Sequence, residues 1–598
     1  MENKEQIRKY TDRQLFKKIG KYIKPALPKF MLAMFFVLVI VLLDLLPSIL
    51  TGEVVKILNN EDGIFKNVPW PKIELIGVVL LIYGLVLICA CLINYFYQKL
   101  LQNIGQDLVY QVREDVFNHL ERLSIGQLQK EPIGKLVTRV TNDTNALSEL
   151  FTSVLVLLIK YLITIVAIYV VMWVTNVRLT AYISIVLPFI FISSFLFRKV
   201  SRKSYRNVRN NISQMNSYLS ENISGMKVTQ IFNQEEKKYK EFKERNISLK
   251  KAHLNQIFVF SIFRPFMYLL FVVCTVICLY FGSIEVKNGA MVSGSLVTYY
   301  SLVGQFFNPI ENLAEQFNQL QSALASCEKI FTVLDTVREI DDTKDAIDPG
   351  KLKGRIEFKN VWFSYNPGVW ILKDVSFVIE PGETCAFVGA TGAGKTTILS
   401  LICRNYEFQK GEILIDGIDI RKIKIDALRR NIGQMLQDVF LFSGKIRDNI
   451  TIYEPSYSDQ DIMKAASFVN ADNLINKYPD KLDHIVEERG VNYSSGERQL
   501  ISFARTILSN PNIMILDEAT ANIDTETEKV IQDSLEKMMS IGTMLIVAHR
   551  LSTIQHADKI IVLNHGEIVE SGNHQELLKK HGMYYALYKL QYKDQENA

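Results

Sequence analysis

The sequence predicts two domains of different class: an all-α membrane domain of six helices with long cytoplasmic helical extensions, followed by an α/β domain. A chain of 598 residues is too long for a single hydrophobic core. Long apolar runs occupy the part before about residue 320, and strand-like and helix-like segments alternate after residue 354. We therefore expect the membrane domain at residues 1–325, a polar linker at 326–353 and the α/β domain at 354–598.

The N-terminal segment is polar and basic, and no short apolar core or small-residue cleavage site follows it, so we expect no cleaved signal peptide. Residues 12–30 instead predict an amphipathic helix lying on the membrane surface. On that surface its basic side chains would meet anionic lipid; they are Lys17, Lys18, Lys21 and Lys24.

Six runs have about the 20 apolar residues that a helix needs to cross a bilayer. They lie at about 31–51, 73–97, 150–174, 179–197, 257–282 and 292–317. The sixth run is marginal, because polar residues interrupt it at Gln305, Asn308, Glu311 and Glu315. A polar final span usually lines a cavity rather than facing lipid.

The charges of the connecting segments predict the orientation. Segments 98–149 and 198–256 are long and polar, and the second is rich in arginine and lysine, whereas the connections 175–178 and 283–291 are short and carry few charges. Positive charge marks the cytoplasmic side, so we expect both long segments, both termini and the α/β domain there. The absence of targeting segments favours a bacterial plasma membrane. Breaks at Pro132–Gly134 and Gly225 predict short transverse helices at the far ends of these segments, able to rest on a soluble domain.

Among the charged residues inside the apolar runs, Asp44, Lys160 and Arg264 need separate consideration. Charge is costly in hydrocarbon, so we expect these side chains to face the bundle interior or water. A contact with a substrate or ion is one interpretation. The other is a structural pair, or an Arg264 that lies at the cytoplasmic interface.

Two compositional features limit the partners. The net charge of +5 is small for this length and does not indicate nucleic acid. The seven cysteines have no zinc-ligand spacing, which favours buried free thiols.

A phosphate loop follows the apolar strand that starts at Cys385. The glycine-rich stretch leads into a helix from Ile398, and this order of strand, loop and helix lets backbone N–H groups and the helix N-terminus face phosphates. Lys395 is expected to reach the β- and γ-phosphates of ATP, and Thr396 to ligate Mg²⁺. The candidate nucleotide-binding residues here are Gly389, Ala390, Thr391, Gly392, Ala393, Gly394, Lys395, Thr396 and Thr397.

An acidic pair, Asp517 and Glu518, ends a second apolar strand at 513–516. We expect Asp517 to hold Mg²⁺ and Glu518 to polarise the water that attacks the γ-phosphate. His549 follows a third strand at 544–547. It is a candidate for bonding the γ-phosphate or for positioning Glu518, and a structural role is its alternative.

These motifs, in this order, make residues 354–598 similar to the nucleotide-binding domain of ABC transporters. Tyr365 matches the aromatic residue that stacks on adenine, and Gln437 matches the glutamine that touches Mg²⁺. Ser494 and Gly496 lie in the signature position, Asp524 ends the loop after the second carboxylate, and His549 matches the switch histidine. Residues 1–325 resemble the membrane domain of ABC exporters, with coupling segments around Arg139, Asp143 and Glu221–Gly225.

The resemblance implies a half-transporter that hydrolyses ATP. In this family two such halves sandwich two ATP molecules head to tail, each between the phosphate loop of one chain and the signature of the other. The closing and opening of this sandwich tilts the membrane helices between inward-facing and outward-facing states.

The signature departs from the family pattern Leu-Ser-Gly-Gly-Gln, because this chain has Tyr493-Ser-Ser-Gly-Glu497. Ser495 adds a side chain where backbone approaches phosphate, and Glu497 adds a negative charge near it. With its own catalytic motifs intact, the chain is expected to pair with a non-identical half-transporter that has an intact signature and an altered catalytic glutamate. The alternative is a harmless change.

Export of amphipathic compounds such as drugs, lipids or peptides is the leading functional hypothesis. Aromatic residues of the late spans would form an adaptable cavity, or simply face lipid and neighbouring helices; they are Phe258, Phe260, Phe263, Phe266, Tyr268, Tyr299, Tyr300, Phe306 and Phe307. Uptake by the same fold and an ATP-gated channel or signalling protein are the alternatives. The six spans exclude a soluble ABC protein that acts on ribosomes or DNA.

Overall fold

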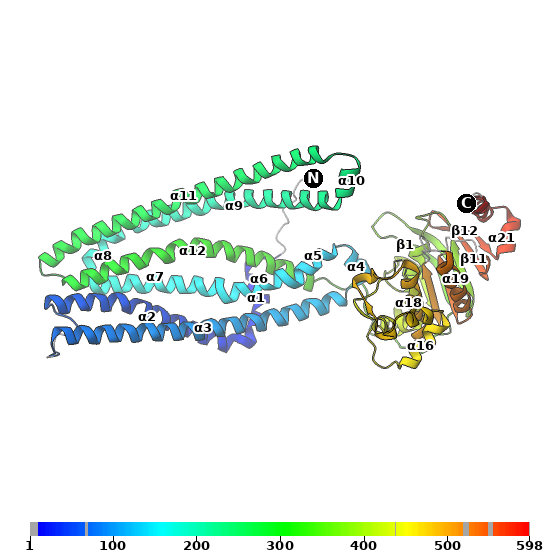
Figure 1. The fold of residues 1–598 in the computed structure, drawn as a ribbon, viewed down its shortest axis with the longest axis horizontal. Coiled ribbons are helices and arrows are strands. Elements are labelled where there is room, and N and C mark those ends of the chain that lie inside the picture. Colours follow the sequence, from blue (N-terminus) through cyan, green and yellow to red (C-terminus); the bar gives the residue numbers. More distant parts are fainter. Residues whose placement is uncertain are drawn as a thin grey trace. The chain divides into compact units, whose positions relative to one another are not determined.

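A computed structural model describes residues 10–65, 68, 70–436, 438–517, 525–547 and 554–596. The chain divides into two compact units (Figure 1). The first contains residues 1–121 and 134–336, and the second contains residues 122–133 and 337–598. The short segment 122–133 therefore belongs to the second unit although it lies between two helices of the first.

The first unit is built of helices, most of them long (Figure 1). They are α1 (Asp12–Ile23), α2 (Leu27–Asn59), α3 (Lys72–Glu121), α5 (Ile133–Thr138), α6 (Thr144–Glu149), α7 (Leu155–Thr175), α8 (Val177–Ser184), α9 (Leu187–Ser224), α10 (Met226–Ile231), α11 (Glu235–Lys287) and α12 (Ser293–Leu334). Short π-helical turns at Arg139–Asp143 and Leu150–Val154 join α5, α6 and α7.

Five helical runs among the described residues are long and apolar enough to cross a membrane. They are Arg13–Asn59, Lys72–Glu121, Ile133–Thr175, Val177–Ser224 and Glu235–Lys287. The 50 residues of α3 extend about 75 Å, far more than the ~30 Å hydrocarbon core of a bilayer. The predicted long helical extensions are therefore present. The sixth predicted span, 292–317, is helical within α12, and its polar residues keep it out of this set, so its crossing stays a prediction.

The structure adds detail to two expected segments of this unit. The predicted linker at 326–353 begins inside α12, which continues to Leu334 because Cys327, Ile330 and Phe331 keep a helical apolar spacing and are buried. The amphipathic helix α1 packs on protein, since its Leu15 and Ile19 are buried in the same apolar cluster as Phe331.

The basic residues of α1 are used in two ways. The Lys18 ammonium pairs with Asp335 at the end of α12 and lies 5.6 Å from the centre of the Phe331 ring, so Lys18 faces protein and not lipid. Lys17, Lys21 and Lys24 are exposed, and a contact with anionic lipid remains a prediction for them.

The cysteines follow the expectation in part. All seven are free thiols, and Cys274, Cys278, Cys327, Cys385 and Cys403 are buried. Cys89 and Cys91 are exposed on α3, because an apolar run that crosses a membrane does not have to be buried by protein.

The second unit is α/β, as predicted. Its main sheet has six strands in the order β12-β11-β3-β10-β9-β6, all parallel except the edge strand β12. These strands are β3 (Thr384–Val388), β6 (Ile432–Met435), β9 (Ile513–Asp517), β10 (Thr543–Val547), β11 (Lys559–Asn564) and β12 (Glu567–Gly572). Alternate residues of the central strands enter two separate apolar cores; on β10, for example, Ile546 enters one and Leu545 the other. The central strands are therefore buried on both faces.

A four-stranded antiparallel sheet and a two-stranded sheet complete the strands of this unit within the described residues. Their strands are β1 (Ile356–Phe363), β2 (Leu372–Ile379), β4 (Lys410–Ile415), β5 (Ile418–Asp419), β7 (Gly444–Lys445) and β8 (Ile485–Val486). The helices are α4 (Ile125–Gln129), α13 (Lys395–Ile402), α14 (Ile425–Asn431), α15 (Ile446–Thr451), α16 (Asp459–Phe468), α17 (Asp472–Asn476), α18 (Ser495–Leu508), α19 (Thr525–Met539), α21 (His574–Lys580) and α22 (Met583–Glu596).

Candidate active site

The order of the strands brings the predicted catalytic segments to one edge of the main sheet. Strand β10 lies between β3 and β9, and its last residue, Val547, pairs with Phe387 on one side and Asp517 on the other. Because the three strands are parallel, their carboxyl ends lie together, and the loop after β3 starts at the same edge as the end of β9. The phosphate loop and Asp517 thus lie at the edge where α/β proteins bind ligands.

The phosphate loop has a backbone conformation that requires glycine at two positions. Gly389 has φ of +153° and Gly394 has φ of +105°. A Cβ at Gly389 would lie 2.2 Å from the carbonyl oxygen of Leu563, and one at Gly394 would lie 2.7 Å from a methyl carbon of Leu372. The glycines predicted from the motif are therefore needed for the tight path of the chain as well as for access to phosphate.

Helix α13 starts directly from this loop. Among the described residues, no side chain caps its N-terminus at Gly394. An α-helix leaves its first backbone N–H groups without an intrahelical partner, and together with the helix dipole these groups favour an anion.

Lys395 lies within the phosphate loop. Its ammonium donates to the carbonyl oxygens of Gly389 at 2.7 Å and Ala390 at 3.1 Å, and the residue is 6% exposed. Burial lowers the pKa of this ammonium below its usual value, while the charge of Asp517 acts in the opposite direction. A buried cation at a helix N-terminus is well placed to hold phosphate oxygens.

Thr396 and Asp517 come together from different elements. The Thr396 hydroxyl donates to a carboxylate oxygen of Asp517 at 3.4 Å. A hydroxyl and a carboxylate at this separation are the hard oxygen donors that Mg²⁺ prefers when phosphates supply its other ligands. The residues present fit the ion, although among the described residues no group of three His, Cys, Asp or Glu side chains forms a metal cage.

Tyr365 lies beside the phosphate-loop helix in an aromatic cluster. Its hydroxyl is 3.1 Å from that of Thr397, and its ring meets those of Phe363 and Tyr406 edge to face, with centroids 4.8 Å and 5.0 Å apart. The side chain is half-exposed, so a ring face is available for stacking.

Tyr406 is a residue of this cluster that sequence reasoning missed. Its hydroxyl donates to the Gln129 side chain at 2.6 Å, and a Cβ at Gly126 would lie 2.5 Å from its ring. The transverse segment 122–133, expected to rest on a soluble domain, therefore belongs to the same unit as the aromatic cluster. In the sequence, Gly126 was the one sign of this contact, because a residue with a side chain would collide with the Tyr406 ring.

The signature residues form a closed hydrogen-bonded turn at the start of α18. The Ser494 hydroxyl accepts from the backbone N–H of Glu497 at 3.1 Å, and the Glu497 carboxylate accepts from the N–H of Ser494 at 2.9 Å. Lys477 lies 3.3 Å from the same carboxylate, and Gly496 is buried. The Glu497 carboxylate therefore caps the helix and has a cationic neighbour, and the expected effect of its charge on nearby phosphates stays a prediction.

Four predicted site residues lie outside the described residues, and their roles stay predictions. They are Gln437, Glu518, Asp524 and His549.

Comparisons with known proteins agree with this geometry. The sequence matches the ABC transporter transmembrane region over residues 30–310 and the ABC transporter family over residues 372–521. It is 37% identical to the putative ABC transporter ATP-binding protein exp8 of Streptococcus pneumoniae, covering 96% of this chain and 97% of that protein. It is 32% identical to an ATP-dependent lipid A-core flippase of Syntrophus aciditrophicus, covering 97% of this chain and 95% of that protein.

Two further similarities fit the same group. A probable multidrug resistance ABC transporter protein of Bacillus subtilis, YheH, is 38% identical, covering 87% of this chain and 77% of that protein. The fold matches that of a bacterial Atm1-family ABC exporter solved with ATP bound, with a TM-score of 0.77 at 24% identity over 96% of this chain and 98% of that one. The chain therefore belongs to the ABC transporter family, as an exporter-type half-subunit whose fused ATPase domain couples ATP hydrolysis to transport.

Proposed function

We propose that the protein exports amphipathic small molecules, lipids or peptides by alternating access, as one half of a dimer. The observation that carries this proposal is the meeting of the phosphate loop, Thr396 and Asp517 at one sheet edge, in a chain whose described residues include five membrane-length apolar helices. The names of two relatives, a lipid A-core flippase and a fatty acid ABC transporter, support an amphipathic substrate. In this proposal the ATPase domain and both termini lie in the cytoplasm of a bacterial cell.

The proposed ATP site uses this chain's residues in distinct roles. Lys395 and the N–H groups of the phosphate loop hold the phosphates, and Tyr365 stacks on adenine. Thr396, Asp517 and Gln437 ligate Mg²⁺, which neutralises charge on the phosphate oxygens when bound. Glu518 orients the attacking water, and His549 holds Glu518 in position. Ser494 and Gly496, followed later in the sequence by Asp524, would serve the site completed by the partner.

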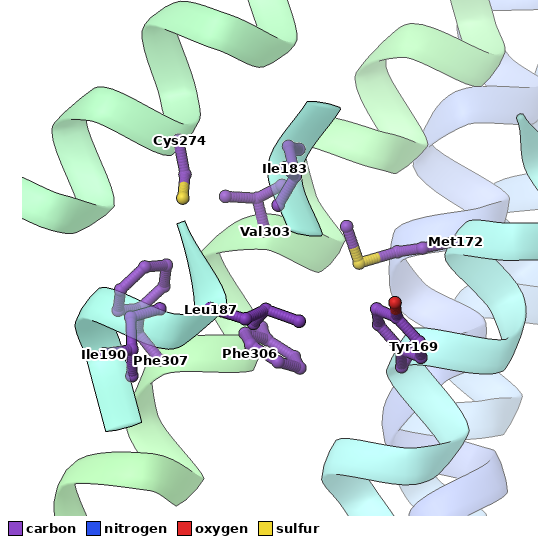
Figure 2. A pocket seen from close by; sticks show the side chains of 9 residues that line it. All are labelled: Tyr169, Met172, Ile183, Leu187, Ile190, Cys274, Val303, Phe306 and Phe307. Carbon is purple, nitrogen blue, oxygen red and sulfur yellow. The ribbon is translucent and has the colours of Figure 1, made fainter. Parts of the chain in front are cut away.

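Apolar side chains inside the first unit support an amphipathic substrate. Figure 2 shows a small pocket to which α7, α8, α9, α11 and α12 contribute, lined by Tyr169, Met172, Ile183, Leu187, Ile190, Cys274, Val303, Phe306 and Phe307. Phe306 and Phe307 belong to the aromatic set expected to form the cavity, whereas Phe258 and Tyr268 are exposed and fit the alternative of facing lipid. Rings and a thioether around a gap can adapt to varied apolar groups.

The partner is proposed to be a second half-transporter. Ser495 and Glu497 in the signature favour a non-identical partner with an intact signature. The pairing of Glu497 with Lys477 and the Ser494 N–H favours a second candidate, a homodimer, because it reduces the charge cost of the altered signature.

Transport is tested in proteoliposomes whose ATPase domains face outward. Mg²⁺ and ATP added outside should drive a fluorescent amphipathic dye into the lumen, and Glu518→Gln should abolish this accumulation. Glu567→Gln, the same change at an exposed position of β12, should leave it intact. ATP-driven loss of preloaded dye would indicate uptake. Conductance that persists in Glu518→Gln would indicate a gated channel, and either result overturns export.

The partner is tested by purifying the chain alone. Full ATP turnover by the homodimer would contradict the heterodimer and support the second candidate. Turnover that appears only after addition of another half-transporter would support the heterodimer.

A further inference from the structure

Polar side chains from three helices meet inside the first unit. Helices α2, α7 and α12 pack on one another. Lys160 on α7 lies 3.5 Å from the carboxylate of Asp44 on α2. One turn further along α2, the Ser48 hydroxyl is 2.8 Å from that of Ser301 on α12 and accepts from the Gln305 amide at 2.9 Å. An ion pair and a hydrogen-bonded group thus lie one helical turn apart along α2.

Asp44 lies on the packed side of α2, yet its carboxylate is accessible. Residues four apart share a helix face, and both Ile40 and Ser48 are almost fully buried. The exposed apolar residues of α2, such as Leu38 and Leu42, point in a different direction, because positions two apart do not face the same way. The Asp44 side chain is nevertheless 47% exposed. A carboxylate on the inward side of the helix is therefore open to a ligand.

The neighbouring face of α12 continues this polar surface. Its polar residues recur at intervals of four, three, four and three, which places them on one face of the helix; they are Ser301, Gln305, Asn308, Asn312 and Glu315. Gly52 approaches Gly294 and Thr298, whereas Ser48 contacts Ser301 and Gln305, so α2 and α12 run antiparallel. Moving one turn along α2 from Ser48 to Asp44 therefore means moving one turn along α12 from Gln305 to Asn308. At Asn308 the polar face of α12 becomes exposed.

The balance of charge at this surface favours a cation. Lys160 is 23% exposed, about half as much as Asp44, so the accessible partner of the pair is the negative one. Glu311 and Glu315 add further negative charge along α12. The 3.5 Å separation is longer than the ~2.8 Å of a strong charge-assisted hydrogen bond, which leaves Asp44 oxygens available to a second cation.

We propose that Asp44 binds the cationic group of the transported amphipath, with Lys160 as the resident counter-ion that neutralises Asp44 when the substrate leaves. The transported compounds are then lipophilic cations. A compound that is always neutral or anionic lacks the positive charge needed to displace Lys160 from Asp44. This inference rests on the proposed export function, because it names the substrate class of that activity. A carboxylate within a membrane-spanning helix would be costly without either cation, which explains why a lysine lies beside it.

The test uses two ions of nearly identical shape and opposite charge, tetraphenylphosphonium and tetraphenylborate. Their binding to the full-length protein in lipid nanodiscs, with any co-purifying partner, is measured by equilibrium dialysis without nucleotide. Asp44→Asn should weaken tetraphenylphosphonium binding about tenfold and leave tetraphenylborate binding unchanged. Lys160→Gln should strengthen tetraphenylphosphonium binding about threefold, because the competing cation is gone. Asp107→Asn, which breaks the exposed Asp107–Lys29 pair at 3.2 Å, is the matched control and should change neither.

Opposite effects of Asp44→Asn and Lys160→Gln on the same cation cannot arise from loss of folding, which would weaken both. Equal tetraphenylphosphonium affinity in Asp44→Asn and wild type, or no binding by wild type, overturns the proposal, as does equal weakening of both ions. ATP-driven accumulation of a neutral dye alongside any of these results refutes the cation site and leaves export intact. Asp44-dependent cation binding without ATP-driven movement refutes export and leaves the site intact.

Discussion

Two helix N-termini of the second unit, those of α13 and α18, belong to motifs that bind ATP in this family, and they are built in opposite ways. Helix α13 begins at Gly394 with no side-chain cap among the described residues, so its N–H groups remain available. Helix α18 begins at Ser494 with a complete capping box, in which Glu497 also lies next to Lys477. One terminus is left open for a ligand by glycine, and the other is satisfied by the protein's own side chains.

The difference gives a physical reason to expect that the signature change costs less ATPase activity than its charge alone suggests. A glutamate at this position of a capping box accepts from the N-cap N–H as an amide oxygen would. The negative charge also lies in the first turn of a helix, where the dipole favours it. The phosphate loop has no such flexibility, because Gly389 and Gly394 have backbone angles and close neighbours that exclude a side chain.

The largest expected effect on ATP hydrolysis comes from a substitution at the uncapped N-terminus of α13. Lys395→Met should reduce ATP hydrolysis about a hundredfold or more, since it removes the buried cation that holds the phosphates. Steady-state hydrolysis by the full-length protein measures this. Lys445→Met removes an exposed lysine that pairs with Asp483 and should retain activity. Comparable losses in the two variants would mean that general damage, not phosphate binding, explains the result.

Two effects make glycine necessary in the same loop, namely backbone strain at positive φ and collision of a Cβ with neighbouring atoms. Two alanine substitutions distinguish them. Gly392→Ala meets only strain, because φ is +82° and no atom lies within 4 Å of the new Cβ, so it should cost about 1–2 kcal/mol. Gly389→Ala adds a collision with the Leu563 carbonyl and should cost about 3 kcal/mol or more, or abolish folding. Thermal unfolding of both variants gives the order, and a reversed order would contradict the loop geometry.

The lowered pKa of Lys395 predicts a pH dependence of ATP binding at alkaline pH. Only the protonated amine attracts phosphate, and burial moves its pKa below the usual value of 10.5. Affinity should therefore fall as pH rises through this lowered pKa, earlier than an exposed lysine would allow. Nucleotide binding measured from neutral to alkaline pH tests this, with Lys395→Gln as the variant in which this fall is absent. A fall that begins only above 10.5 would contradict the effect of burial.

The smallest effect is expected at the capped terminus. Glu497→Ala removes the capping carboxylate and should lower stability by about 1 kcal/mol, whereas Glu497→Gln keeps an accepting oxygen and should change it by a few tenths. Chemical denaturation distinguishes the two. Glu497→Gln should also leave ATP turnover within about threefold of wild type, because Lys477 already offsets the charge. A much larger rise would restore the argument for a damaging signature and hence for an unlike partner.

Much of the architecture follows from local patterns that the sequence displays directly. The apolar runs predicted membrane helices, and the alternation of strand and helix predicted the α/β unit. The phosphate loop was readable because glycine spacing, lysine and the following helix lie within a short stretch. The amphipathic helix α1 was predicted as well, but its spacing of Leu15 and Ile19 indicates only an apolar face and cannot say whether lipid or protein covers it.

The sequence by itself determined the fold class, the residues of the phosphate loop and the acidic end of β9, because these depend on neighbours close in the chain. The tertiary structure decided which distant groups meet. The Thr396 hydroxyl contacts Asp517, and Tyr406 contacts Gln129 of α4. Lys477 lies beside Glu497, and Lys160 lies beside Asp44. Such pairs depend on strand order and helix packing, where the free energy of burial across the whole core, and not any local preference, selects the arrangement.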